Sequence, residues 1–170
     1  MHDTNLGSAM METLYEAICR DKDGHVKWIA HAKNLVVTEG LNTLISNTFK
    51  SAAGSVVWYL GLKSTGTPVA GDVMNSHASW TELVAYSEAN RVTFNNSGTV
   101  TGGSLSNSAN KARFTANGNM TVYGLFMTSS NTKSGTTGTL YGAADFSEGS
   151  RSMVSSDTLD VTATVSATAS

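Results

Sequence analysis

From residue 56 to the end of the chain, short runs of β-branched and aromatic residues alternate with stretches rich in Ser, Asn, Gly and Thr. Such runs favour half-buried strands, and the polar stretches favour turns. The candidate strands are 56–63, 80–86, 91–95, 100–105, 111–116, 120–128, 139–146, 151–154 and 158–167. A spacing of roughly 8–12 residues between strands is typical of all-β folds. We therefore expect a mainly β protein, a jelly roll or β-sandwich of about eight or more strands.

The chain is expected to form one domain. Its 170 residues are enough to bury roughly 70% of the unfolded surface around a single core. Neither a repeat of fixed period nor a linker divides it. Residues 1–13 show no clear hydrophobic period, so we predict an N-terminal arm over 1–13 and a single β domain over 14–170.

Two interpretations compete for the segment after the arm. Residues 8–20 have apolar positions that fit one face of a short helix. Alternatively, 14–20 is a strand, 21–24 a tight turn of sequence Asp-Lys-Asp-Gly, and 25–34 the returning strand. The second interpretation is favoured, because Asp and Gly suit hairpin loops and apolar residues alternate after the turn.

One segment, 39–52, has the pattern of a helix. Thr38 is a candidate N-cap, and Glu39 lies in the first turn, where the helix dipole favours a negative charge. Gly54 follows as a plausible end. The apolar stripe at helical spacing consists of Leu41, Leu44, Ile45, Phe49 and Ala52. We expect this stripe to face the core, with the helix plugging one open edge or end of the β structure.

Charge and hydropathy argue against several partners. The net charge is −2 and only 14% of residues are charged, with Lys and Arg scattered singly. We therefore expect no nucleic-acid partner. No apolar run approaches the ~18 residues of a membrane span, so we expect no membrane partner. Residues 1–5 lack the layout of a signal peptide, which predicts a cytosolic product at synthesis.

The sequence carries no recognisable reactive site. The four histidines (His2, His25, His31 and His77) are far apart, and no Cys accompanies them at metal-binding spacing. Cys19 is alone and is best interpreted as a small buried hydrophobe. The Asp-Lys-Asp-Gly run is only a fragment of a calcium loop, and no Gly-x-Ser-x-Gly run exists. We expect no catalytic, cofactor-binding or metal-binding residues, no cofactor, and a protein that is not an enzyme.

Four groups of phrases, in this order, resemble small virion proteins of tailed bacteriophages. They are HVKW (25–28) with NLVVTEGLN (34–42); WYLGL (58–62); AGD (70–72) with SHASWTE (76–82) and AYSE (85–88); and GTLYG (138–142) with FS (146–147), RS (151–152) and DTL (157–159). The resemblance runs from about Tyr15 to Val165. It is strongest to the capsid cement, or decoration, proteins of short-tailed phages.

That resemblance implies a jelly-roll body in a homo-oligomer, either a dimer or a trimer. It also implies a virion protein on the capsid exterior, synthesised in the host cytoplasm, which reinforces contacts between major capsid protein subunits. No catalytic residue comes with it. Residues 1–13, 65–79 and 129–138 are candidates for elements that reach a neighbour, or are ordinary loops. The alternatives are a tail, fibre or knob component, and a carbohydrate-binding β module.

Overall fold

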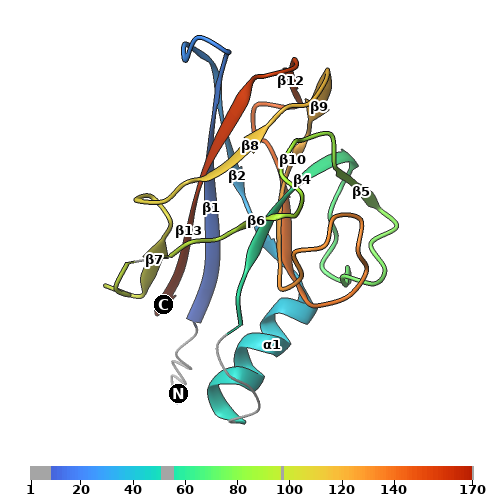
Figure 1. Cartoon of the computed structure of the whole chain (residues 1–170). Helices are drawn as coiled ribbons and strands as arrows, with labels where there is room; N and C mark the ends of the chain where they lie inside the picture. Colours follow the sequence, from blue (N-terminus) through green and yellow to red (C-terminus); the bar gives the residue numbers. More distant parts are fainter. Residues whose placement is uncertain (1–8, 51–55, 97, 170) are drawn as a thin grey trace.

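A computed structural model describes residues 9–50, 56–96 and 98–169. Within these ranges the protein is mainly β, with two large sheets packed face to face and a two-stranded ribbon (Figure 1). This architecture is consistent with the predicted β-sandwich. All strand pairings between the named strands are antiparallel.

The first sheet has the order β2-β1-β13-β7, and β8 also pairs with β13. Its strands are β1 (Ala9–Arg20), β2 (Val26–Lys33), β7 (Ser104–Ser106), β8 (Ala112–Thr115) and β13 (Thr158–Ala169). The long pair β1 and β13 runs from Ala9 opposite Ala169 to Arg20 opposite Thr158. The N- and C-terminal strands therefore lie side by side at the centre of this sheet.

The second sheet has the order β3-β11-β10-β4-β5, and β6 also pairs with β4. Its strands are β3 (Leu35–Val36), β4 (Tyr59–Gly66), β5 (Trp80–Leu83), β6 (Val92–Thr93), β10 (Gly124–Thr128) and β11 (Leu140–Asp145). The ribbon pairs β9 (Met120–Val122) with β12 (Arg151–Met153). The segment predicted as one strand over 120–128 is thus two strands, because the chain leaves the ribbon at Tyr123 to enter the second sheet.

The boundary between the N-terminal arm and the β domain was predicted after residue 13, but the first strand already begins at Ala9. Residues 9–13 belong to β1, where Thr13 is fully buried and the strand alternates inward and outward residues as far as Arg20. The run from Ala9 to Thr13 hides this pattern, because its residues are not strongly β-forming. The hairpin of β1 and β2 is confirmed, with its turn at 21–25. Residues 1–8 of the predicted arm lie outside the described residues.

Two cores hold the sandwich together. The larger lies between the sheets and includes Tyr15, Ala17, Cys19, Leu60, Leu62, Phe114, Leu125, Met127, Leu159, Val161 and Ala163. The smaller is formed by Val37, Met74, Trp80, Phe126, Leu140 and Ala143. Gly61 makes room for this second core, because a Cβ there would lie 2.3 Å from the Phe126 ring. The second sheet is therefore covered on both faces.

The helix α1 (Thr38–Phe49) lies at one end of the sandwich, as expected (Figure 1). Its N-cap is Val37 and makes no side-chain cap hydrogen bond, so the prediction of Thr38 as the cap was wrong. Gly40 is the buried residue of the helix, and its Cα lies so close to β11 that a Cβ would be 2.3 Å from the Tyr141 carbonyl oxygen. The helix therefore docks through a glycine.

The predicted core-facing stripe was also wrong. Leu41, Ile45 and Phe49 are 41%, 58% and 76% exposed, and Leu44 is half-buried. Docking through Gly40 turns most of the apolar face away from the sheets. Ala52 and Gly54 lie outside the described residues. No helix among the described residues is both long and apolar enough to cross a bilayer.

Candidate functional site

An apolar groove opens between the two sheets beside α1. Its volume is about 240 Å³, and it is lined by Leu44, Val56, Trp58, Phe94, Asn96, Leu105, Met127, Tyr141 and Val165. Leu44 joins this groove to the exposed face of α1, where Leu41, Ile45 and Phe49 lie. Together, the groove and this helix face are called the apolar end below.

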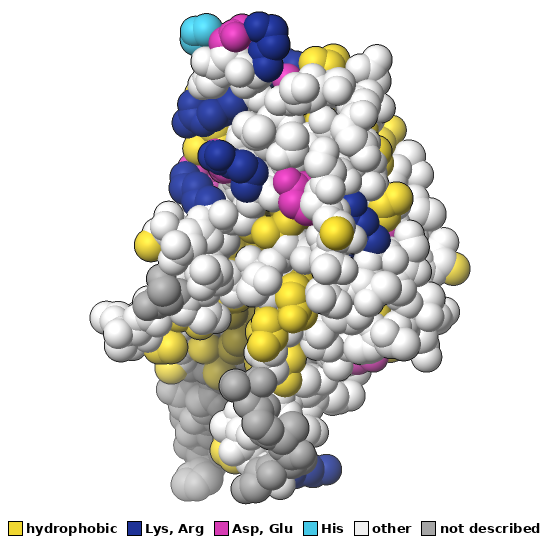
Figure 2. All heavy atoms as spheres, viewed as in Figure 1, with side chains coloured by type: hydrophobic (Ala, Val, Ile, Leu, Met, Phe, Trp, Pro, Cys, Tyr) yellow, Lys and Arg dark blue, Asp and Glu magenta, His cyan; other side chains and the backbone are white. Residues whose placement is uncertain are grey.

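Charge is distributed unevenly over the face of the molecule shown in Figure 2. Figure 2 shows hydrophobic side chains gathered in a hollow in the lower half of the view, whereas Lys and Arg lie mainly over the upper half. The upper region includes the β1–β2 hairpin, whose turn carries Asp21, Lys22, Asp23 and His25 (Figure 1). An uncharged, concave surface of this kind can bind an apolar partner without removing charges from water.

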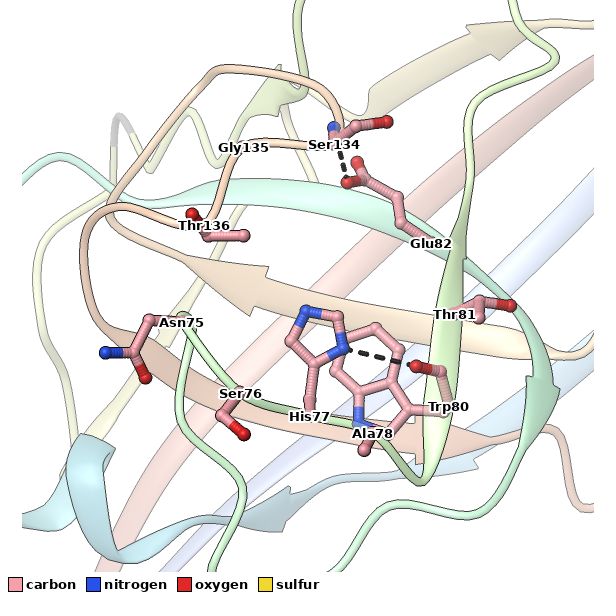
Figure 3. Close-up of a pocket in the computed structure, with 10 residues that line it drawn as sticks. All are labelled: Asn75, Ser76, His77, Ala78, Trp80, Thr81, Glu82, Ser134, Gly135 and Thr136. Carbon is pink, nitrogen blue, oxygen red and sulfur yellow. Dashed lines mark hydrogen bonds between the residues drawn. The ribbon is translucent and has the colours of Figure 1, made fainter.

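A second cavity lies outside the second sheet, between the connection 67–79 and the loop 129–139. Its volume is about 460 Å³ (Figure 3). The lining residues are Asn75, Ser76, His77, Ala78, Trp80, Thr81, Glu82, Ser134, Gly135 and Thr136. We call this the loop cavity. Its wall includes the stacked rings of His77 and Trp80, whose centroids are 4.1 Å apart at an angle of 19°.

Two carboxylates, the buried Asp72 and the half-buried Glu39, hold the first of these loops. Asp72 accepts hydrogen bonds from Val69 N at 2.8 Å and from the indole Nε1 of Trp80 at 3.0 Å. Glu39 of α1 accepts hydrogen bonds from Met74 N at 2.9 Å and Leu140 N at 2.7 Å. Hydrogen bonds thus hold the connection between β4 and β5, one of the candidate reaching elements, against the body.

An ion pair fixes the second loop. The fully buried Arg91 side chain donates to both carboxylate oxygens of Glu82, at 2.9 and 2.8 Å. The same guanidinium donates to Ser130 O and Gly135 O, both at 3.0 Å, and Glu82 accepts from Ser134 N at 2.8 Å. Bidentate pairs of this kind impose a defined geometry. The loop 129–139 is therefore built around Arg91.

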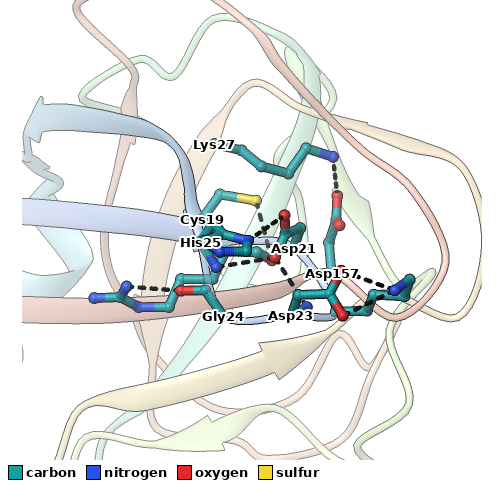
Figure 4. Close-up of polar contacts among 9 residues, drawn as sticks. Cys19, Asp21, Asp23, Gly24, His25, Lys27 and Asp157 are labelled. Carbon is teal, nitrogen blue, oxygen red and sulfur yellow. Dashed lines mark hydrogen bonds and ion pairs between the residues drawn. The ribbon is translucent and has the colours of Figure 1, made fainter.

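The β1–β2 turn brings together the ligand atoms of Asp21, Asp23 and His25, all within 4.8 Å of one another (Figure 4). Each has a structural contact there. Asp21 Oδ1 accepts from Asp23 N and His25 N, both at 2.9 Å, and Asp23 pairs with Lys22. Desolvation tends to raise the pKa of Asp21, but hydrogen bonds from His25 and Asp23 outweigh it and lower that pKa. The hairpin itself accounts for this cluster.

Cys19 is fully buried between the sheets, as predicted. Burial, followed by the charge of nearby Asp157, raises the pKa of the thiol to about 12. Asp157 itself pairs with Lys27 at 2.5 Å (Figure 4). Because only a thiolate is a good nucleophile, this cysteine is poorly suited to covalent chemistry near neutral pH.

The four histidines have different surroundings. His25 lies in the hairpin turn, His31 contacts Glu148, and His77 lines the loop cavity, whereas His2 is outside the described residues. Sequence reasoning missed the loop cavity altogether. The phrase SHASWTE (76–82) was not recognised as part of a site, although it supplies six of the lining residues, namely Ser76, His77, Ala78, Trp80, Thr81 and Glu82.

Comparison of the chain with protein-family models, with curated proteins and with solved structures gave no match.

Proposed function

We propose that this protein is a non-enzymatic structural component of a bacteriophage virion, which binds the outside of the capsid. In this role it reinforces contacts between major capsid protein subunits. The sequence resemblance supplies the virion context, and the observation that carries the binding role is the apolar end. Contiguous apolar surface on a soluble protein commonly marks a protein interface.

The proposed occupant of the apolar end is the capsid shell. Interface centres are depleted of charge and enriched in aromatic residues, and Trp58, Phe94 and Phe49 supply such side chains at this end. Phe49 protrudes and the groove beside it is concave. The Phe49 ring can therefore insert into a partner, and a side chain of the partner can insert into the groove. The charged hairpin at the other end then remains in solvent. Many copies on one lattice multiply a modest affinity.

The test is add-back of the full chain to phage heads that lack it, followed by cryo-electron microscopy. Wild-type protein is expected to decorate the outer shell with the α1 end inward. The double variant Ile45→Ser, Phe49→Ser should bind at least about tenfold more weakly, because it removes two exposed apolar side chains from the interface centre. Val154→Ser, at a half-exposed residue next to β12 at the far end, is the matched control and should bind normally.

Other results of these experiments would assign the apolar end to a different partner. Density confined to the tail of the native virion would replace the shell with a tail or fibre partner. Dimers in solution that dissociate in the double variant, with shell binding unchanged, would assign the apolar end to a second copy of this chain. Equal shell occupancy by the double variant and the wild type would also contradict the proposal.

A further inference from the structure

The loop cavity has the construction of a binding site. Both of its loops are held by charged side chains: the buried Asp72 and the half-buried Glu39 hold one, and the buried pair of Arg91 with Glu82 holds the other. A buried ion pair adds little to stability compared with apolar residues of the same size. A preorganised wall lowers the entropy that a ligand loses on binding. At about 460 Å³, the cavity also falls within the size range of ligand pockets.

Half of the ten lining residues have an uncharged hydroxyl or amide side chain that can form hydrogen bonds with a ligand. Hydroxyl groups come from Ser76, Thr81, Ser134 and Thr136, and an amide comes from Asn75. Among the ten lining residues, all of which the structure describes, the single carboxylate is that of Glu82. It already accepts hydrogen bonds from Arg91 and Ser134. The lining contains no Lys or Arg, so an anionic ligand would find no opposite charge.

His77 adds an aromatic face and a hydrogen-bond acceptor of fixed direction, and the buried Trp80 lies beneath it. His77 Nδ1 is 3.2 Å from Trp80 O, and a carbonyl oxygen can only accept, so Nδ1 is the donor. In the neutral ring, Nε2 is then a hydrogen-bond acceptor, and Figure 3 shows it on the side of His77 away from Trp80 O. The Trp80 ring is fixed from behind by Asp72 and by Phe126, 5.1 Å away.

We propose that the loop cavity binds a neutral saccharide. A sugar ring presents hydroxyls around its rim, which match the Ser, Thr and Asn side chains and His77 Nε2. Its electropositive C–H face packs against the electronegative face of the His77 ring, which covers the buried Trp80. The proposal is independent of shell binding, because the loop cavity and the groove at the apolar end share no lining residue.

The test is saturation-transfer NMR and calorimetry on the full chain with methyl glycosides of glucose, galactose, mannose, N-acetylglucosamine and rhamnose. At least one should bind at millimolar concentration or below. Thr136→Tyr should abolish this binding by filling the cavity, whereas Thr137→Tyr, in the same loop but outside the lining, should leave it unchanged. His77→Phe keeps an aromatic ring beside Trp80 but loses Nε2, and should weaken binding about tenfold.

Thermal melting of each variant separates loss of binding from loss of fold. Thr136 and Thr137 are both exposed, so melting temperatures close to wild type are expected. The proposal is overturned if no glycoside in the panel binds, or if Thr136→Tyr binds as well as Thr137→Tyr. Tighter binding of glucose 6-phosphate or glucuronate than of every neutral glycoside would overturn the assignment of a neutral ligand.

Discussion

At the scale of single residues, Glu148 shows how an exposed side chain can protect a sheet edge. Its carboxylate accepts from His31 N at 2.9 Å and lies 2.8 Å from His31 Nδ1, while Ser147 N donates to His31 O at 2.8 Å. These contacts occupy the outer edge of β2 at His31. Open edges otherwise invite pairing with other chains. The hydrogen bonds from His31, the backbone bond first, lower the pKa of Glu148 from 4.5 to about 2.

The lowered pKa predicts a specific dependence on pH. A carboxylate whose pKa is lower in the folded state stabilises the fold at pH values above its usual pKa, and this contribution disappears as the pH falls towards the folded value. Glu148→Gln should therefore lower the melting temperature by a few degrees at most near pH 7. The difference from wild type should shrink between about pH 5 and pH 2. Melting curves of both proteins between pH 2 and pH 7 test this prediction. A difference in melting temperature that stays constant down to pH 2 would contradict it.

At the scale of elements, α1 packs against the body at Gly40 and exposes its apolar side chains, such as Phe49, to solvent. Gly40→Ala should destabilise the protein by about 1–3 kcal/mol, because the new methyl group would meet the Tyr141 carbonyl. Phe49→Ser should change stability by no more than about 0.5 kcal/mol, since the ring is 76% exposed. Chemical denaturation of the two variants measures both effects. A larger loss for Phe49→Ser would show that the ring packs against the body.

The same element shows how far the sequence could predict the fold. In β13, which the sequence predicts as a strand over 158–167, the apolar residues at alternate positions, Leu159, Val161 and Ala163, are buried in the core. In α1, helical spacing correctly predicted an apolar face, but the expectation that this face packs against the core was wrong. Spacing alone does not specify which side of a helix contacts the sheets. The role of Arg91 in holding the loop 129–139 could not be predicted from the sequence. Arg91 reaches Gly135 across a large gap in sequence, and local patterns contain no information about such contacts.

At the scale of the whole molecule, the proposed functions occupy different regions of one sandwich. The groove of the apolar end lies between the sheets, whereas the loop cavity lies outside the second sheet, over the small core. Phe126 and Met127 are neighbours in β10, yet Phe126 supports Trp80 beside the loop cavity and Met127 lines the groove. Neighbouring residues of a single strand, facing opposite sides of the sheet, thus contribute to both surfaces.

The pairing of β1 with β13 also determines how the chain must fold. The pair closest in sequence is Arg20 with Thr158, so almost the whole chain must close into a loop before the first sheet is complete. A permutant that fuses residue 170 to residue 1 and begins at Ala109, in the exposed connection after β7, turns β1 and β13 into a hairpin. Shortening a loop more than tenfold recovers about 2 kcal/mol of closure entropy.

If β1 and β13 pair in the folding transition state, this permutant should refold about tenfold or more faster than the unpermuted chain. Its unfolding rate should be nearly unchanged, because the native contacts are the same. Stopped-flow tryptophan fluorescence measures both rates, since Trp28, Trp58 and Trp80 all contact the hydrophobic cores. An unchanged refolding rate would show that the sandwich forms first and that the two terminal strands join it after the rate-limiting step.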